Sequence, residues 1–133
     1  IMLEILKQEI FPKIICVEYN SFFGNEPLTV KYIENFQRKS IDDKKGLYFG
    51  ASLEAWKIIF KKYNYKFICV DKSGVNAFFI FPKYFGTDIF DNIGLNFQYS
   101  KIYEKIYKLD GQTIRDDFLK KFKNELININ DLL

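Results

Sequence analysis

Histidine is absent from the 133-residue sequence, and cysteine occurs only twice, at Cys16 and Cys69. The missing histidine removes the side chain most used for acid–base catalysis and the commonest metal ligand. Two separated cysteines without a histidine do not make a zinc site, so we expect no bound metal. No G-x-S-x-G turn and no G-x-x-x-x-G-K loop occurs, which argues against serine hydrolysis and against a phosphate-binding loop.

A large excess of charge of one sign is also lacking. The chain carries 20 basic and 17 acidic residues, and every basic residue except Arg38 and Arg115 is a lysine. The net charge of +3 gives no electrostatic case for nucleic-acid binding. No apolar run approaches the roughly 20 residues needed to cross a bilayer. We therefore expect neither nucleic acid nor a membrane as a partner.

Cys16 and Cys69 each lie inside an apolar run. We interpret them as buried free thiols rather than a disulfide, which predicts a reducing, cytoplasmic location. Hydrophobic residues make up 48% of the chain, so we expect residues 1–133 to form one packed α/β domain. Ile1 precedes Met2, which suggests a piece of a longer protein. A homodimer or a missing amino-terminal half is then the expected partner.

Residues 48–82 read as one helix followed by two strands. Ser52 can cap a helix over residues 53–63, in which apolar residues recur at helical spacing, and Asn64 can end it. Two runs rich in aromatic and β-branched residues follow, at 65–70 and 75–81, with Gly74 in the turn between them. A helix that leads into a strand and its hairpin partner is typical of the end of an α/β sheet.

The amino-terminal part predicts a helix over residues 2–10, which Pro12 ends, and a strand over 14–19. The nearly unbroken apolar run at 14–17 is typical of a strand covered on both faces, as in a parallel sheet. Glu18 and Asn20 follow at its carboxyl end, where open α/β sheets bind ligands. Glu18 is therefore a candidate functional carboxylate. The alternative is that it only hydrogen-bonds a neighbouring loop amide.

The remaining segments carry weaker patterns. Residues 28–32 fit a short edge strand, and the polar stretch 40–45 fits a solvated loop tip. Helices are expected over 98–109, with Ile102, Ile106 and Leu109 on one side, and over 114–126, with Thr113 as the cap. The tail is expected to extend the second helix.

Four motifs in order resemble the carboxyl-terminal half of an FkbM-related, S-adenosylmethionine-dependent methyltransferase-like protein. They are E-Y-N after a strand, S-F-F-G-N-E-P-L-T-V-K-Y, Y-F-G-A-S-L at a helix start, and S-G-V-N-A-F-F-I leading to P-K. The similarity covers residues 2–83, and residues 84–133 form a helical extension beyond it. The resemblance implies a Rossmann-like sheet whose last three strands are 14–19, 66–71 and 76–81. The last of these is expected to run antiparallel, inserted between the other two.

The resemblance also implies roles for residues at the strand ends. Glu18 is the expected base, Asn20 and Asn76 would orient the methyl acceptor, and Tyr19 would form a pocket wall. The acceptor class is a small molecule or a glycan. The glycine-rich turn that binds the cofactor in this family is missing, so we expect no S-adenosylmethionine binding by this chain alone. The alternative function is a non-catalytic α/β module for interaction or for holding a substrate.

The strand at residues 14–19 is also expected to have an unpaired edge. An exposed edge of this kind pairs readily with another chain, and proteins usually cover it. We expect either a symmetry partner or the carboxyl-terminal tail to cover this one.

Overall fold

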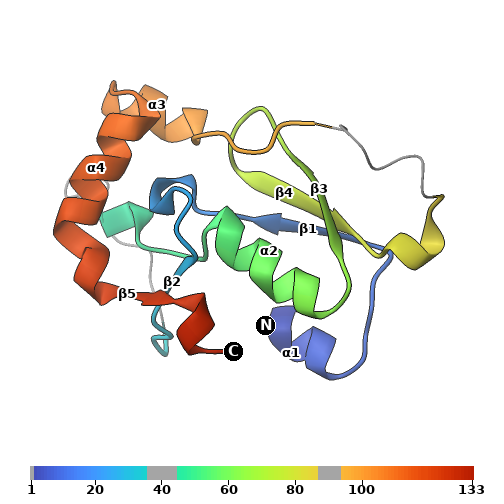
Figure 1. Ribbon diagram of the computed structural model, residues 1–133. Coiled ribbons are helices and arrows are strands. Elements are labelled where there is room, and N and C mark those ends of the chain that lie inside the picture. Colours follow the sequence, from blue (N-terminus) through green and yellow to red (C-terminus); the bar gives the residue numbers. More distant parts are fainter. Residues whose placement is uncertain (1, 36–44, 87–93) are drawn as a thin grey trace.

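Three strands form the central sheet of the computed structural model, which describes residues 2–35, 45–86 and 94–133 (Figure 1). They lie in the order β1 (Ile14–Glu18), β4 (Asn76–Ile80) and β3 (Lys66–Val70). β4 is antiparallel to both neighbours, so β1 and β3 run in the same direction. The expected insertion of the last strand between the other two is present. The chain is thus mixed α/β, although antiparallel pairing in all the described strands is not typical of a Rossmann-like sheet.

Helix α2 (Leu53–Lys62) packs on this sheet and matches its predicted bounds closely. Ser52 caps it, because the Ser52 Oγ accepts a hydrogen bond of 3.0 Å from the Ala55 N–H. Asn64 has a φ of 63°, the left-handed conformation that ends many helices. The Phe60 ring lies 4.5 Å from the Phe79 ring of β4, centroid to centroid, which joins the helix to the middle of the sheet.

Burial along β1 alternates, so the expectation of a strand covered on both faces is wrong. Ile15 and Val17 are buried, whereas Ile14 is 57% exposed and Cys16 is exposed. The strand register places Ile15 opposite Phe79, on the face that packs against α2, and Cys16 opposite Phe78 on the other face. Both cysteines are free thiols, as expected, but neither is buried: Cys16 is exposed and Cys69 is half-buried.

Helix α1 (Met2–Lys7) is shorter than the predicted 2–10. Glu9 adopts a φ of 61°, which ends the helix before Pro12 is reached. Leu6 is buried in the same apolar cluster as Ile15, while Ile10, expected on the apolar face, is 53% exposed.

A second sheet joins two segments far apart in the sequence. β2 (Leu28–Val30) is the predicted edge strand, and it pairs antiparallel with β5 (Leu126–Asn128). The tail was expected to extend a helix or to cover β1, and instead it provides β5. Helix α4 (Gly111–Phe122) ends earlier than predicted, and the 3-10 helix η5 (Lys123–Glu125) leads into β5.

Helices α3 (Lys101–Tyr107) and α4 enclose a second apolar cluster with the 3-10 helix η1 (Ser21–Phe23). α3 does not use the predicted apolar side, since Ile102, Ile106 and Leu109 are all exposed. It packs through Tyr103, whose ring meets the Phe22 ring edge-on at 5.5 Å.

Asp110 caps α4 in place of the predicted Thr113. The Asp110 carboxylate accepts a hydrogen bond of 3.0 Å from the Thr113 N–H. A carboxylate at a helix start is favoured by the helix dipole, and with Asp110 as cap the helix begins at Gly111, three residues before the predicted start.

Short 3-10 helices complete the described chain: η2 (Lys45–Leu47), η3 (Pro82–Tyr84) and η6 (Ile129–Asp131). The predicted loop tip at 40–45 lies outside the described residues except at Lys45. Within the described part of the chain, no helix has the length and apolar character needed to span a bilayer.

Candidate functional site

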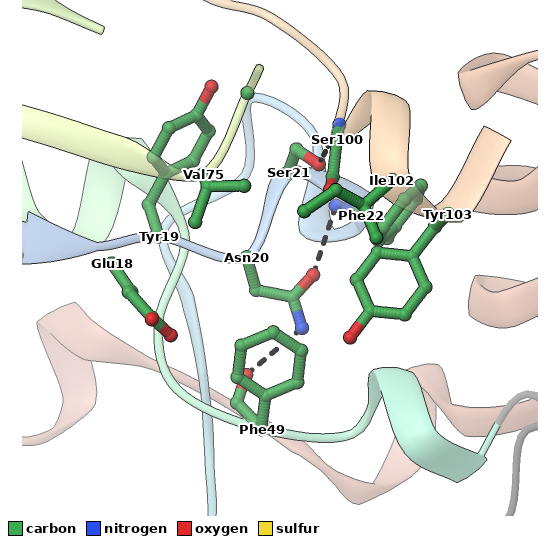
Figure 2. A pocket seen from close by; sticks show the side chains of 11 residues that line it. Glu18, Tyr19, Asn20, Ser21, Phe22, Phe49, Val75, Ser100, Ile102 and Tyr103 are labelled. Carbon is green, nitrogen blue, oxygen red and sulfur yellow. Dashed lines mark hydrogen bonds between the residues drawn. The ribbon is translucent and has the colours of Figure 1, made fainter. Parts of the chain in front are cut away.

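A pocket of about 150 Å³ lies where β1 ends (Figure 2). Its lining comes from the end of β1 and η1, from the loop before α2, from the β3–β4 turn and from the start of α3. The residues are Glu18, Tyr19, Asn20, Ser21, Phe22, Phe49, Gly74, Val75, Ser100, Ile102 and Tyr103. Three of the four residues selected from the sequence, Glu18, Tyr19 and Asn20, therefore lie together in this pocket.

Glu18 contributes the only charged side chain to this lining. Its carboxylate makes no hydrogen bond or ion pair with the described residues, so it does not cap a loop amide there. Its backbone carbonyl accepts a hydrogen bond of 2.9 Å from the Trp56 indole. The carboxylate thus remains able to accept a proton or a hydrogen bond from a ligand.

The buried Asn20 amide ties two loops to the strand end. Its Nδ2 donates to the backbone carbonyls of Leu47 and Phe49, and its Oδ1 accepts from the Phe22 N–H at 3.1 Å. Both amide hydrogens are therefore engaged within the chain. For orienting a ligand, Asn20 has only the remaining acceptor capacity of its Oδ1.

Tyr19 forms one wall of the pocket, and its hydroxyl points away from Glu18 and Asn20 (Figure 2). The hydroxyl donates to the Gln98 carbonyl at 2.6 Å and accepts from the Gln98 N–H at 3.2 Å. Burial raises the pKa of Tyr19 to about 12. The Tyr19 hydroxyl is thus uncharged at neutral pH. It links the end of β1 to Gln98 and is poorly suited to proton transfer.

Asn76 lies opposite Glu18 in the strand register but outside the pocket lining. Its side-chain Nδ2 donates to the Asp71 carboxylate at 3.1 Å. Asp71 also accepts the Ser73 hydroxyl at 2.6 Å and the backbone N–H groups of Val75 and Asn76. Burial alone would raise the pKa of Asp71, but these hydrogen bonds together lower it below its ordinary value. Asn76, the first residue of β4, thus stabilises the β3–β4 turn through Asp71, and this turn carries Gly74 and Val75 to the pocket.

Two serines in the pocket were not singled out as site residues from the sequence. The Ser100 N–H donates to the Ser21 Oγ at 2.9 Å, which brings the two side chains side by side (Figure 2). Both residues are buried, and the Ser100 Oγ has no hydrogen-bond partner among the described residues. A serine before a helix suggests a cap, and the sequence gives no sign that residues 21 and 100 meet.

Comparisons with protein-family models, with curated proteins and with solved structures give no match to this chain.

The pocket residues do not fit S-adenosylmethionine. Pockets for cofactors of that size are usually about 300 Å³ or larger, twice the volume found here. Gly74 is the only glycine in the lining, and the Tyr99 carbonyl oxygen lies 2.2 Å from where a Cβ would stand, so its backbone is already covered. The pocket can accept a small polar group, and its described residues supply no site for the cofactor.

Proposed function

We propose that this chain is the substrate-side part of an S-adenosylmethionine-dependent methyltransferase with a Rossmann-like fold, related to the FkbM kind. The observation that carries the proposal is the strand order β1-β4-β3, with β4 antiparallel between two strands that run in the same direction. This is the arrangement that the sequence resemblance implies for the last three strands of such a sheet.

The position of the pocket supports the same proposal. It opens at the carboxyl end of β1, where α/β sheets bind their ligands, and Glu18 supplies a carboxylate there. In the proposed reaction, Glu18 accepts the proton of an acceptor hydroxyl on a small molecule or a glycan. Asn20 and Tyr19 hold the loops and strand end that shape the pocket.

The cofactor would be held by residues outside this chain, in an amino-terminal half or a partner copy. β1 is an edge strand of the described sheet, and we propose that its free edge receives that partner. Two free cysteines support a cytoplasmic location for the assembly.

A second candidate function is a non-catalytic module that holds a substrate. The observation in its favour is that three of the four predicted site residues already use their polar groups within the chain. The Asn76 amide, the Asn20 amide hydrogens and the Tyr19 hydroxyl all make hydrogen bonds there. Of the four predicted site residues, only Glu18 then remains for proton transfer, and an exposed carboxylate serves binding equally well.

A titration of the full-length native protein with S-adenosylmethionine, after a mass measurement that establishes its length, separates the two functions. Saturable binding together with methyl transfer supports the enzyme, and Glu18→Gln is then expected to lose transfer while it keeps cofactor binding. A full-length protein that binds no cofactor would be a non-catalytic module.

A further inference from the structure

The Ser100 hydroxyl is a buried polar group without a hydrogen-bond partner among the described residues. Ser100 is 4% exposed, and its Oγ has no hydrogen-bond partner in the described chain. Ser100 stands at the cap position of α3 but makes no side-chain cap bond. Buried hydroxyls are usually paired, because leaving one unpaired costs free energy. Ser100 lines the pocket, so a ligand group bound there can complete its unpaired hydroxyl once the side chain turns toward the pocket.

Ser21 adds a second hydroxyl beside the first. Its Oγ accepts the Ser100 N–H, and its O–H hydrogen is still able to donate. The two serines therefore offer donors and acceptors to one ligand group from adjacent positions. A ligand hydroxyl, which both donates and accepts, matches such a pair.

The rest of the lining narrows the ligand class. The aromatic rings of Phe22, Phe49 and Tyr103 form much of the wall, and the lining contains no lysine or arginine. Glu18 carries the only charge there, so an anionic ligand would meet repulsion while ligand O–H groups would find an acceptor. A volume of about 150 Å³ corresponds to about five water molecules of the liquid, which suits one small ring or a short chain.

We infer that this pocket binds one unit of a neutral polyol. Ser100 and Ser21 bind one of its hydroxyls, and Glu18 accepts a hydrogen bond from another. Ser100 is then a specificity-determining residue for hydroxylated ligands. The role of the polyol as a methyl acceptor rests on the proposed function. Polyol binding itself is tested without a cofactor.

The test is an NMR titration of the ¹⁵N-labelled protein with three probes: methyl α-D-glucopyranoside, myo-inositol and glucuronate. The neutral probes are expected to shift the amide signals of Ser21, Val75 and Ser100, and glucuronate at equal concentration is not. Ser100→Ala is expected to weaken neutral-probe binding about tenfold through the lost hydroxyl contact. Its melting temperature should stay unchanged or rise, because the Ser100 Oγ makes no hydrogen bond with the part of the chain that the structure describes.

Two control variants distinguish a loss of ligand binding from a loss of stability and test the role of the Glu18 charge. Ser52→Ala removes a buried serine whose Oγ accepts two backbone hydrogen bonds, from Ala55 and Leu28, so it shows the melting loss expected of a structural serine. Glu18→Gln changes an exposed side chain, and it should let glucuronate bind in the same pocket.

Binding by the neutral probes without methyl transfer in the full-length protein would overturn the proposed function and leave the polyol site standing. The polyol site is overturned if neither neutral probe binds, if glucuronate binds equally well, or if Ser100→Ala binds like the unmodified protein. A melting loss in Ser100→Ala as large as that of Ser52→Ala would also overturn it, since Ser100 would then be a structural cap.

Discussion

The Trp56 indole N–H donates a hydrogen bond of 2.9 Å to the backbone carbonyl of Glu18. Glu18 is the last residue of β1, an edge strand of the described sheet, and Trp56 lies on α2. Nearby, the Asn20 N–H donates to the Ala51 carbonyl at 2.8 Å. Helix α2 and the loop before it thus bind backbone groups at the end of β1 that carries the pocket, and they fix its position.

Trp56→Phe tests the contribution of this bond. Phenylalanine keeps an aromatic ring against Phe60 but lacks the N–H, so stability should fall by about 0.5–1.5 kcal/mol. Urea unfolding measures the loss. Tyr63→Phe is the matched control, because it removes a hydroxyl at the carboxyl-terminal end of the same helix, and this hydroxyl makes no hydrogen bond with a described residue. Equal losses in the two variants would mean that the indole bond does not matter.

Tyr19→Phe should destabilise the protein more. The Tyr19 hydroxyl bonds both the N–H and the carbonyl of Gln98, and its loss leaves those groups unpaired in a partly buried place. We expect a loss of about 1–3 kcal/mol at pH 7. Chemical unfolding measures it, and faster amide exchange at residue 98 should accompany it. A variant as stable as the unmodified chain would show that water replaces the hydroxyl without cost.

Tyr19 also predicts a dependence of stability on alkaline pH. Its pKa is raised to about 12 in the folded chain, against 10.0 ordinarily. The folded state therefore holds the proton more tightly, and this contribution is complete below pH 10 and lost as the pH rises from 10 to 12. The contribution is on the order of 2 kcal/mol. The stability gap between the unmodified chain and Tyr19→Phe should narrow over that range, and a constant gap would contradict the assignment.

Local patterns allowed part of this structure to be predicted. Helix α2 and the β3–β4 hairpin lie within one stretch of sequence, and their caps and turn residues act on near neighbours. Ser52 and Asn64 therefore marked the helix ends correctly. The unbroken apolar run at residues 14–17 led to a wrong prediction. It shows that both faces of β1 are apolar, but it does not show that both faces are covered.

The parts that could not be predicted depend on distant contacts. The pairing of β2 with β5 and the meeting of Ser21 with Ser100 join segments that the sequence separates widely. The candidate site was predicted at the end of β1, where a pocket lies, because strand ends carry ligands in many α/β sheets. The two serines on the other side of the pocket could not be predicted, because their meeting depends on how α3 packs and has no local pattern in the sequence.

Asp71→Asn should destabilise the β3–β4 turn. An amide has one acceptor oxygen in place of two. Its N–H₂ group would face two donors, either the Ser73 hydroxyl with the Asn76 side-chain amide or the backbone N–H groups of Val75 and Asn76. We expect a loss of about 1–3 kcal/mol at pH 7, measured by urea unfolding.

Acid should remove the same contribution from the unmodified chain. The pKa of Asp71 is lowered on folding, so its stabilisation is present above the ordinary pKa of 3.8 and is lost as the pH falls below it. The stability of Asp71→Asn should therefore fall less between pH 5 and pH 3 than that of the unmodified chain. Parallel pH profiles would show that the carboxylate charge is not involved.

Gly74→Ala and Gly50→Ala form a matched pair that tests how the β3–β4 turn reaches the pocket. Both glycines have a positive φ, 70° and 64°, so alanine is strained at each by about 1–2 kcal/mol. Only at Gly74 would the new Cβ meet other atoms, with the Tyr99 carbonyl oxygen 2.2 Å away, while nothing lies within 4 Å at Gly50. The added methyl at residue 74 must push the turn away from Tyr99, whose neighbour Ser100 lines the pocket. We expect Gly74→Ala to lose about 2 kcal/mol more than Gly50→Ala and to shift the Ser100 amide signal, since backbone contacts cannot yield as side chains do. Equal losses in the two variants, with Ser100 unmoved, would mean that the turn and the start of α3 are not packed as the structure shows.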